Sequence, residues 1–83
     1  MTLKDTAALM NSENYKDRFI AEYWQTKIRH ERLSKTIEKA EAGELDFKLD
    51  CPLYVLSAQC SYMRQYLRQL EIRAEIENIC LEV

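Results

Sequence analysis

The sequence has 83 residues, of which 31% are charged and 47% hydrophobic, and it contains one glycine and one proline. This length allows one domain, and the scarcity of helix-breaking residues predicts long helices. Twelve basic against fourteen acidic residues give a net charge of -2, which excludes the global basic field that holds proteins on DNA or anionic lipid. We therefore expect a single all-α domain over residues 1–83, with no direct DNA binding.

Two helices are expected before the single glycine. In the N-terminal extension, residues 1–11, Thr2 and Asp5 have the spacing of a capping box ahead of a short helix. Residues 12–42 lack Gly and Pro and form helix one, which Gly43 ends. Its apolar seam, in steps of three and four, is Phe19, Tyr23, Thr26, His30, Leu33, Ile37 and Ala40.

The connector, residues 43–51, has a different periodicity. Leu45, Phe47 and Leu49 alternate with charged residues, which is typical of an extended, strand-like segment. A lone strand has no partner inside a helical protein. We therefore expect these three side chains to be partly buried, over the helix ends or against another copy of the chain.

Helix two is expected over residues 52–80, with Pro52 in its first turn, where its missing N–H would be unpaired anyway. Its seam is Leu53, Leu56, Cys60, Met63, Leu67, Leu70 and Ala74. Because this seam matches that of helix one, the two helices are predicted to form an antiparallel hairpin folded near residue 47. That register places residues 29–32 across from residues 62–65.

Apolar residues remain that a two-helix hairpin cannot bury. They form a row on helix two, which continues to Val83, and an aromatic band on helix one. Since two helices do not enclose a core, we expect a homo-oligomer that buries these residues between chains; packing of the aromatic band within the chain is the alternative. The expected interface residues are Phe19, Tyr23, Trp24, Phe47, Ile72, Ile76 and Ile79.

Basic residues gather near the middle of the two helices, around residues 29–32 and 62–65, which we call the waist of the hairpin. Arg64 and Arg68 repeat at i and i+4, a like-charge spacing that destabilises a helix unless an anion or a carboxylate lies between them. Arginines beside tyrosines and amides can hold a phosphate and stack a base. The candidate ligand-binding residues are Arg29, Arg32, Tyr62, Arg64, Tyr66 and Arg68. The alternative is that surface ion pairs neutralise the arginines, and their partners would be Glu22, Glu31, Glu71 and Glu75.

No catalytic or metal-binding pattern is present. Cys51, Cys60 and Cys80 are odd in number and, without a secretory signal, are expected to be reduced thiols of a cytoplasmic protein. Together with His30 they lack the spacing of a zinc site. One Gly and one His do not furnish a phosphate loop or a Ser/His/Asp set. The apolar runs are also too short to span a bilayer. We expect no metal, no cofactor, no membrane association and no enzymatic activity.

Several stretches of the chain are similar to a known family. They are residues 45–47, 51–53, 66–67, 70–71 and 73–77, with further matches at Tyr15, Tyr23, Lys27, Arg32, Leu33, Leu56, Gln59 and Met63. Over residues 12–79 the chain resembles small, uncharacterised helical-hairpin proteins of crAss-like phages and Gram-positive prophages. More loosely, its architecture resembles phage hairpin proteins that assemble into oligomers and sequester cyclic nucleotide signals of host immunity.

These resemblances imply a phage or prophage accessory protein that acts in the cytoplasm of a bacterial host cell and counters antiviral defence without catalysis. Sequestration of a cyclic nucleotide immune signal in an oligomer is the main expectation. The alternatives are a protein–protein inhibitor of a host defence effector, as anti-CRISPR proteins are, and a purely structural homo-oligomer.

Overall fold

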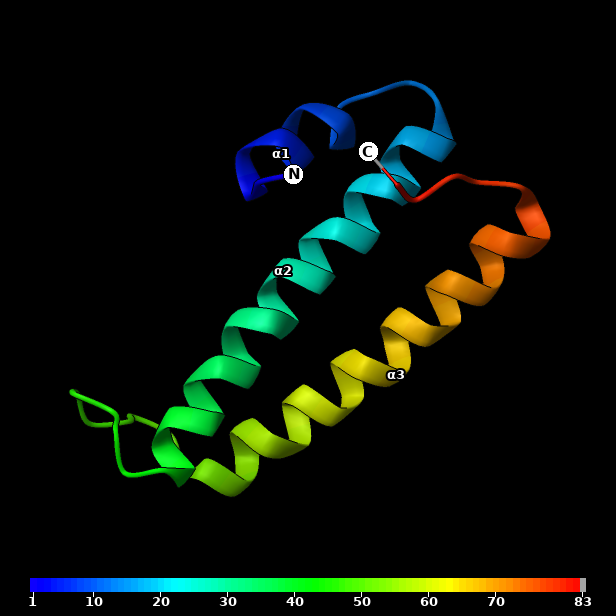
Figure 1. The fold of residues 1–83 in the computed structure, drawn as a ribbon. Coiled ribbons are helices and arrows are strands. Elements are labelled where there is room, and N and C mark those ends of the chain that lie inside the picture. The colour runs from blue at the N-terminus through cyan, green and yellow to red at the C-terminus, as the bar shows by residue number, and fades with distance from the viewer. Residues whose placement is uncertain (83) are drawn as a thin grey trace.

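The computed structural model describes residues 1–82, and Val83, which was expected to extend the apolar row, lies outside the described residues. Three helices follow one another, α1 (Leu3–Met10), α2 (Tyr15–Glu41) and α3 (Leu53–Glu77), and no described residue is in a strand. Helices α2 and α3 lie side by side in opposite directions, and α1 lies against the N-terminal half of α2 (Figure 1). The protein is an elongated all-α hairpin of 43 × 24 × 18 Å.

Local capping groups determine where the helices start and stop. The expected capping box is present, because Thr2 Oγ1 accepts a hydrogen bond from the Asp5 N–H and the Asp5 carboxylate accepts one from the Thr2 N–H. Helix α2 begins at Tyr15 because the side chain of Asn14 caps its first turn. After the end of α2, Gly43 has a φ of 72°, in the left-handed region that favours glycine.

The segment between α2 and α3 is an irregular loop, so the expectation of a strand-like connector is wrong. The backbone bends at Asp46, Phe47 and Asp50. Alternating residues share one side only while a chain stays extended, and these bends end that arrangement. Leu45 and Leu49 are partly buried, but Phe47 is 58% exposed.

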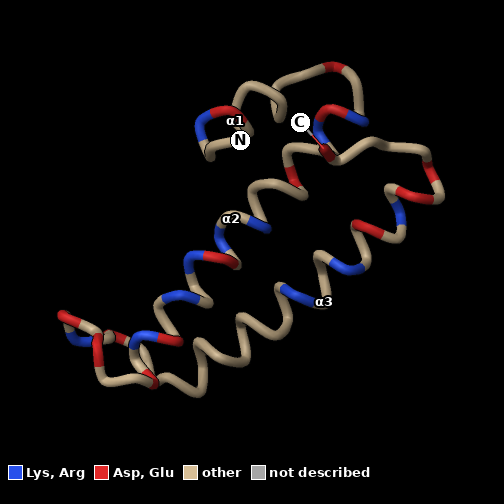
Figure 2. Tube along the Cα trace, viewed as in Figure 1, with Lys and Arg blue, Asp and Glu red and all other residues tan. Residues whose placement is uncertain are grey.

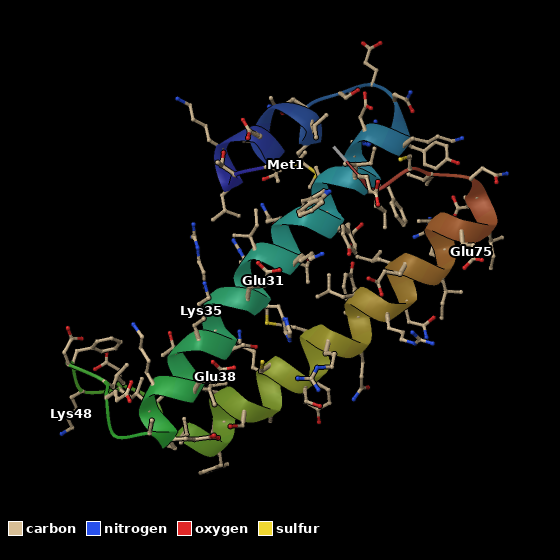
Figure 3. The ribbon with its side chains drawn as sticks, in the orientation of Figure 1. Met1, Glu31, Lys35, Glu38, Lys48 and Glu75 are labelled. Atoms are coloured by element: carbon tan, nitrogen blue, oxygen red, sulfur yellow. The ribbon has the colours of Figure 1, made fainter. Side chains whose placement is uncertain are left out.

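Side-chain hydrogen bonds define the register of the hairpin. The Tyr23 hydroxyl donates to Glu71 at 3.0 Å, and Ser34 Oγ lies 3.2 Å from Cys60 Sγ. Both pairs are centred on residue 47, as the matching seams predict. Residues 29–32 of α2 therefore face residues 62–65 of α3. Side chains of both helices project into the space between them, and Lys48 marks the loop end of the molecule, far from Met1 (Figure 3).

The core lies at the end of the hairpin that holds the chain termini. It consists of Phe19, Tyr23, Leu67, Leu70, Ala74 and Ile79, with Ile20, Trp24 and Leu81 packed against it. At the loop end, by contrast, Ile37 and Cys60 are the buried residues among those described. Most of the apolar burial that stabilises the protein is therefore concentrated near the termini.

A C-terminal tail, residues 78–82, completes this core. Helix α3 ends at Glu77 rather than at residue 80, because Asn78 takes a left-handed conformation (φ 57°) and the Ile79 N–H donates to the Ala74 carbonyl at 2.8 Å. The chain then returns toward α2 (Figure 1), where Trp24 Nε1 donates to the Leu81 carbonyl at 2.7 Å.

The position of the tail corrects the homo-oligomer interface expected from the sequence. Of the seven residues expected at that interface, three are buried in the chain's own core, namely Phe19, Tyr23 and Ile79, and Trp24 packs against that core. The other three are exposed: Phe47, Ile72 and Ile76. A helix continued to residue 80 would align Ile79 with Ile76, but the turn at Asn78 directs Ile79 to the core instead. No helix in the described part of the chain is long and apolar enough to cross a membrane.

Candidate functional site

Four of the six expected ligand-binding residues lie together on the outer surface of α3. With two amides they line one shallow depression, which we call the tyrosine–arginine face: Tyr62, Arg64, Gln65, Tyr66, Arg68 and Gln69. All six belong to one helix, and the Tyr62 side chain is 70% exposed. This chain can therefore contact a ligand at this face from one side only.

An apolar groove between α2 and α3 adjoins the tyrosine–arginine face. It has a volume of about 490 Å³ and is lined by Thr26, Val55, Ala58, Gln59, Tyr62, Met63 and Tyr66. The two tyrosines border both the groove and the face. Arg29 lines a neighbouring depression together with Gln59 and Met63, so the structure brings it to the same side of the hairpin. Arg32 is exposed and lines neither the groove nor the face.

The waist is positively charged although the chain as a whole is acidic. Between residues 53 and 70 there is no acidic residue, and Arg64 and Arg68 are the only charged side chains. Across from them, residues 26–35 of α2 contain four basic residues and one carboxylate, that of Glu31. Figure 2 shows the N-terminal part of α3 without charge, whereas acidic residues occur on α2, in the loops and toward the C-terminal end of α3.

The waist arginines have no carboxylate partner within the described chain. Among residues 1–82 the only ion pair within 4 Å joins Arg73 to Glu77, at 2.8 Å. The acidic residues considered as neutralising partners of the arginines are therefore not paired with them here. Arg64 and Arg68 remain like charges one helical turn apart, a spacing that opposes helix stability.

One of those acidic residues is engaged with the core instead. Glu71 accepts the hydrogen bond from Tyr23, and burial of the phenol, together with this bond, raises the pKa of Tyr23 to about 12. At the same end of α3, the ion pair with Arg73 lowers the pKa of Glu77 below its usual value. Carboxylates on α3 are thus held at its C-terminal end, away from the tyrosine–arginine face.

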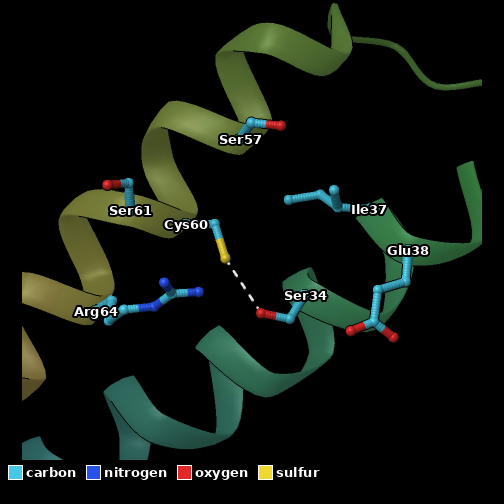
Figure 4. A pocket seen from close by; sticks show the side chains of 7 residues that line it. All are labelled: Ser34, Ile37, Glu38, Ser57, Cys60, Ser61 and Arg64. Atoms are coloured by element: carbon cyan, nitrogen blue, oxygen red, sulfur yellow. Dashed lines mark hydrogen bonds between the residues drawn. The ribbon is translucent and has the colours of Figure 1, made fainter. Parts of the chain in front are cut away.

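A polar cleft lies on the other side of Arg64. It has a volume of about 330 Å³ and is lined by Ser34, Ile37, Glu38, Ser57, Cys60, Ser61 and Arg64. Figure 4 shows the Arg64 guanidinium extending toward the contact between Ser34 and Cys60. Arg64 therefore borders both the cleft and the tyrosine–arginine face. The sequence reasoning missed the serines, although Ser57 and Ser61 repeat at i and i+4 beside the Cys60 seam position.

The remaining reactive residues are dispersed. His30 precedes Ser34 by one turn, and its Nε2 is buried without a hydrogen-bond partner among the described residues. Cys51, Cys60 and Cys80 are free thiols. In residues 1–82, no group of three or more His, Cys, Asp or Glu side chains is placed to hold a metal ion.

The fold and this face define a class of protein: a small helical hairpin with an unpaired cationic and aromatic surface at its waist. The profile of the family described as Sequestin matches residues 13–76. The match includes α2, the connecting loop, nearly all of α3 and every candidate ligand-binding residue, and the chain belongs to the Sequestin family. It leaves out α1 and the C-terminal tail. No curated protein and no solved structure matches the chain.

Proposed function

We propose that this protein binds and sequesters an anionic signalling nucleotide, of the cyclic class used in antiviral defence, and performs no chemistry on it. The observation that carries the proposal is the pair of unpaired arginines on the tyrosine–arginine face, beside two exposed tyrosines. The name of the family supports sequestration of a molecule as the activity. A phage or prophage origin, a site of action in the bacterial cytoplasm and assembly into a homo-oligomer belong to the same proposal.

Each group on the face has a role that suits a nucleotide. Arginine guanidinium groups donate paired, charge-assisted hydrogen bonds to phosphate oxygens, and Arg64 and Arg68 are free to do so. Tyrosine rings stack on bases, at roughly 1–3 kcal/mol per base, and Tyr62 and Tyr66 border an apolar groove that would accept a base edge-on or flat. The amides of Gln65 and Gln69 can donate to and accept from base edges.

Binding also relieves the electrostatic repulsion between Arg64 and Arg68 in the free protein. The phosphate of a ligand placed between Arg64 and Arg68 replaces their mutual repulsion by two attractions. Sequestration requires tight, stoichiometric binding and no turnover. A cationic and aromatic surface provides binding energy of this kind without a nucleophile or a general base.

Replacing both arginines tests the proposal. We expect cyclic dinucleotides or cyclic ADP-ribose to raise the melting temperature of the parent protein, and the variant Arg64→Ala/Arg68→Ala to lose this response and the ability to inhibit a host defence. Without ligand, the double variant should be as stable as the parent or slightly more stable, because the like-charge repulsion is gone. Binding is measured by thermal shift and calorimetry.

The matched control is Lys39→Ala/Lys48→Ala, which removes the same charge from exposed positions at the loop end of the hairpin. It should keep both the thermal response and the inhibition of defence. A double arginine variant that binds and inhibits as well as the parent contradicts the proposal. If the arginines instead serve in surface ion pairs, the double variant loses stability, within about 1 kcal/mol, and shows no functional defect.

The alternatives predicted from the sequence give different results in the same assays. A protein that inhibits a defence effector would co-purify with that effector from host cells and would not respond to nucleotides. A purely structural homo-oligomer would do neither.

A further inference from the structure

Arg64 belongs to two neighbouring sites, and its guanidinium lies at one of them. The side chain lines both the tyrosine–arginine face, on the outer surface of α3, and the polar cleft between α2 and α3. Figure 4 shows the guanidinium directed toward the contact between Ser34 and Cys60, which is inside the cleft. Arg68, one turn further along α3, lines the face and not the cleft. In the free protein, the charged group of Arg64 is thus on the cleft side.

Two electrostatic forces favour this position. Arg68 carries a like charge at i+4, so the guanidinium of Arg64 gains by turning away from it. Glu38 is the one acidic residue that lines the cleft, so the same movement brings the guanidinium toward an opposite charge. The cleft also offers hydroxyl groups that can accept hydrogen bonds from a guanidinium, those of Ser34, Ser57 and Ser61.

The cleft attracts Arg64 without fixing it. Within residues 1–82, the ion pair between Arg73 and Glu77 is the only one within 4 Å, so the carboxylate of Glu38 attracts the guanidinium of Arg64 from a greater distance. The Arg64 side chain is also exposed, and exposed side chains change rotamer within nanoseconds. Movement of the guanidinium out of the cleft therefore breaks no ion pair and needs no change in the helices.

An anion on the tyrosine–arginine face reverses the balance of these forces. A phosphate placed between Arg64 and Arg68 attracts both guanidinium groups, and the repulsion no longer drives Arg64 toward the cleft. The ligand and the cleft then compete for one guanidinium. In such a competition, the apparent affinity for the ligand falls by the fraction of molecules in which the binding group is available.

We infer that Arg64 moves from the polar cleft to the tyrosine–arginine face when an anionic nucleotide binds, and that Glu38 is a positioning residue which weakens binding by competing for Arg64. The inference rests on the proposed function for its ligand, whereas the position of Arg64 in the free protein does not depend on that function. A residue of α2 that lines the cleft and not the face thus adjusts the affinity of a site on α3.

The variant Glu38→Gln tests the competition, because it removes the charge and keeps the shape of the side chain. By calorimetry, cyclic dinucleotides or cyclic ADP-ribose should bind this variant about threefold to tenfold more tightly than the parent. In an Arg64→Ala background the same change should have no effect on binding, because the group that Glu38 attracts is gone. The matched control Glu41→Gln removes an exposed carboxylate of the same helix that does not line the cleft, and should bind as the parent does.

The NMR signal of the Arg64 Nε–H group, assigned by its loss in Arg64→Lys, reports the position of the side chain directly. It should shift in the same direction on addition of nucleotide to the parent and, without nucleotide, in Glu38→Gln.

The outcomes separate the inference from the proposed function. Equal affinities of the parent and Glu38→Gln, or an equal gain in the Arg64→Ala background, overturn the inference and leave the proposed function intact. A parent that binds no nucleotide overturns the proposed function. In that case, a signal of Arg64 that shifts in Glu38→Gln and not in Glu41→Gln supports its position in the cleft, and an unchanged signal overturns that as well.

Discussion

Tyr23 links the buried core to the charges at the surface of the hairpin. Its ring packs in the core, edge-on to Trp24 with the ring centres 5.6 Å apart, while its hydroxyl donates to Glu71. The ammonium group of Lys27 lies 5.6 Å from the centre of the same ring. One residue thus contributes apolar burial, a hydrogen bond and a cation–π contact.

The raised pKa of Tyr23 predicts a loss of stability at high pH. The phenol titrates at about 12 in the folded protein against an ordinary value of 10.0. The unfolded chain therefore releases this proton first, so the stabilisation is complete below pH 10 and decreases as the pH rises toward 12. Urea unfolding of the parent and of Tyr23→Phe over this range measures the effect.

The difference between the two proteins isolates Tyr23, because the other tyrosines and the lysines titrate in both. At neutral pH, Tyr23→Phe should be about 1 kcal/mol less stable through loss of the hydrogen bond. This deficit should shrink as the pH rises above 10. A deficit that is constant with pH contradicts the interpretation.

At the scale of elements, the tail is a short segment that contributes a core residue. It has a specific anchor at each end, the left-handed turn at Asn78 and the hydrogen bond between Trp24 and Leu81. Ile79, between these anchors, is 7% exposed. The tail lies outside the residues that match the family profile, yet the core of this chain depends on it.

Shortening one tail side chain should destabilise the whole hairpin. We expect Ile79→Ala to lower the free energy of unfolding by about 2 kcal/mol, the low end for a buried isoleucine, because a segment near a chain end can partly collapse around the cavity. Cys80→Ala, at the exposed neighbouring position, is the control and should unfold like the parent. Equal unfolding midpoints for Ile79→Ala and the parent would show that the tail is not part of the cooperative unit.

At the scale of the whole molecule, stability is expected to differ between the two ends of the hairpin. The core cluster lies at the terminal end, whereas the loop end has Ile37 and Cys60 as its buried residues. Local opening costs least where few apolar contacts are lost. Segments around Tyr23 and Leu70 should therefore exchange their amide hydrogens more slowly than the helix ends next to the loop.

Native-state hydrogen exchange, read by mass spectrometry or NMR, measures this gradient. Protection should decrease from the core cluster toward Ala40 of α2 and Leu53 of α3. Uniform protection along both helices would indicate that the loop end is stabilised by contacts absent from a single chain. In that case the exposed Phe47 is the first residue to examine at an interface.

The helices, their register and the cationic waist could be predicted from the sequence alone because each depends on spacing along one chain. Seams in steps of three and four place side chains on one face of a helix whatever surrounds it. Two matching seams then gave a register centred near residue 47, and the contacts of Tyr23 with Glu71 and of Ser34 with Cys60 agree with it. The absence of carboxylates between residues 53 and 70 is likewise a property of the sequence.

Only the tertiary structure decided how the surplus apolar residues are divided. The turn at Asn78 depends on one backbone conformation, which periodicity does not encode, and it assigns Ile79 and the aromatic band to the chain's own core. The structure likewise separates Arg32 from the tyrosine–arginine face, and it forms the polar cleft beside Arg64. Both results depend on how the two helices face each other, because that arrangement determines the direction in which each side chain points. Sequence spacing specifies what each helix offers, and packing in three dimensions specifies which of those surfaces remain free to bind.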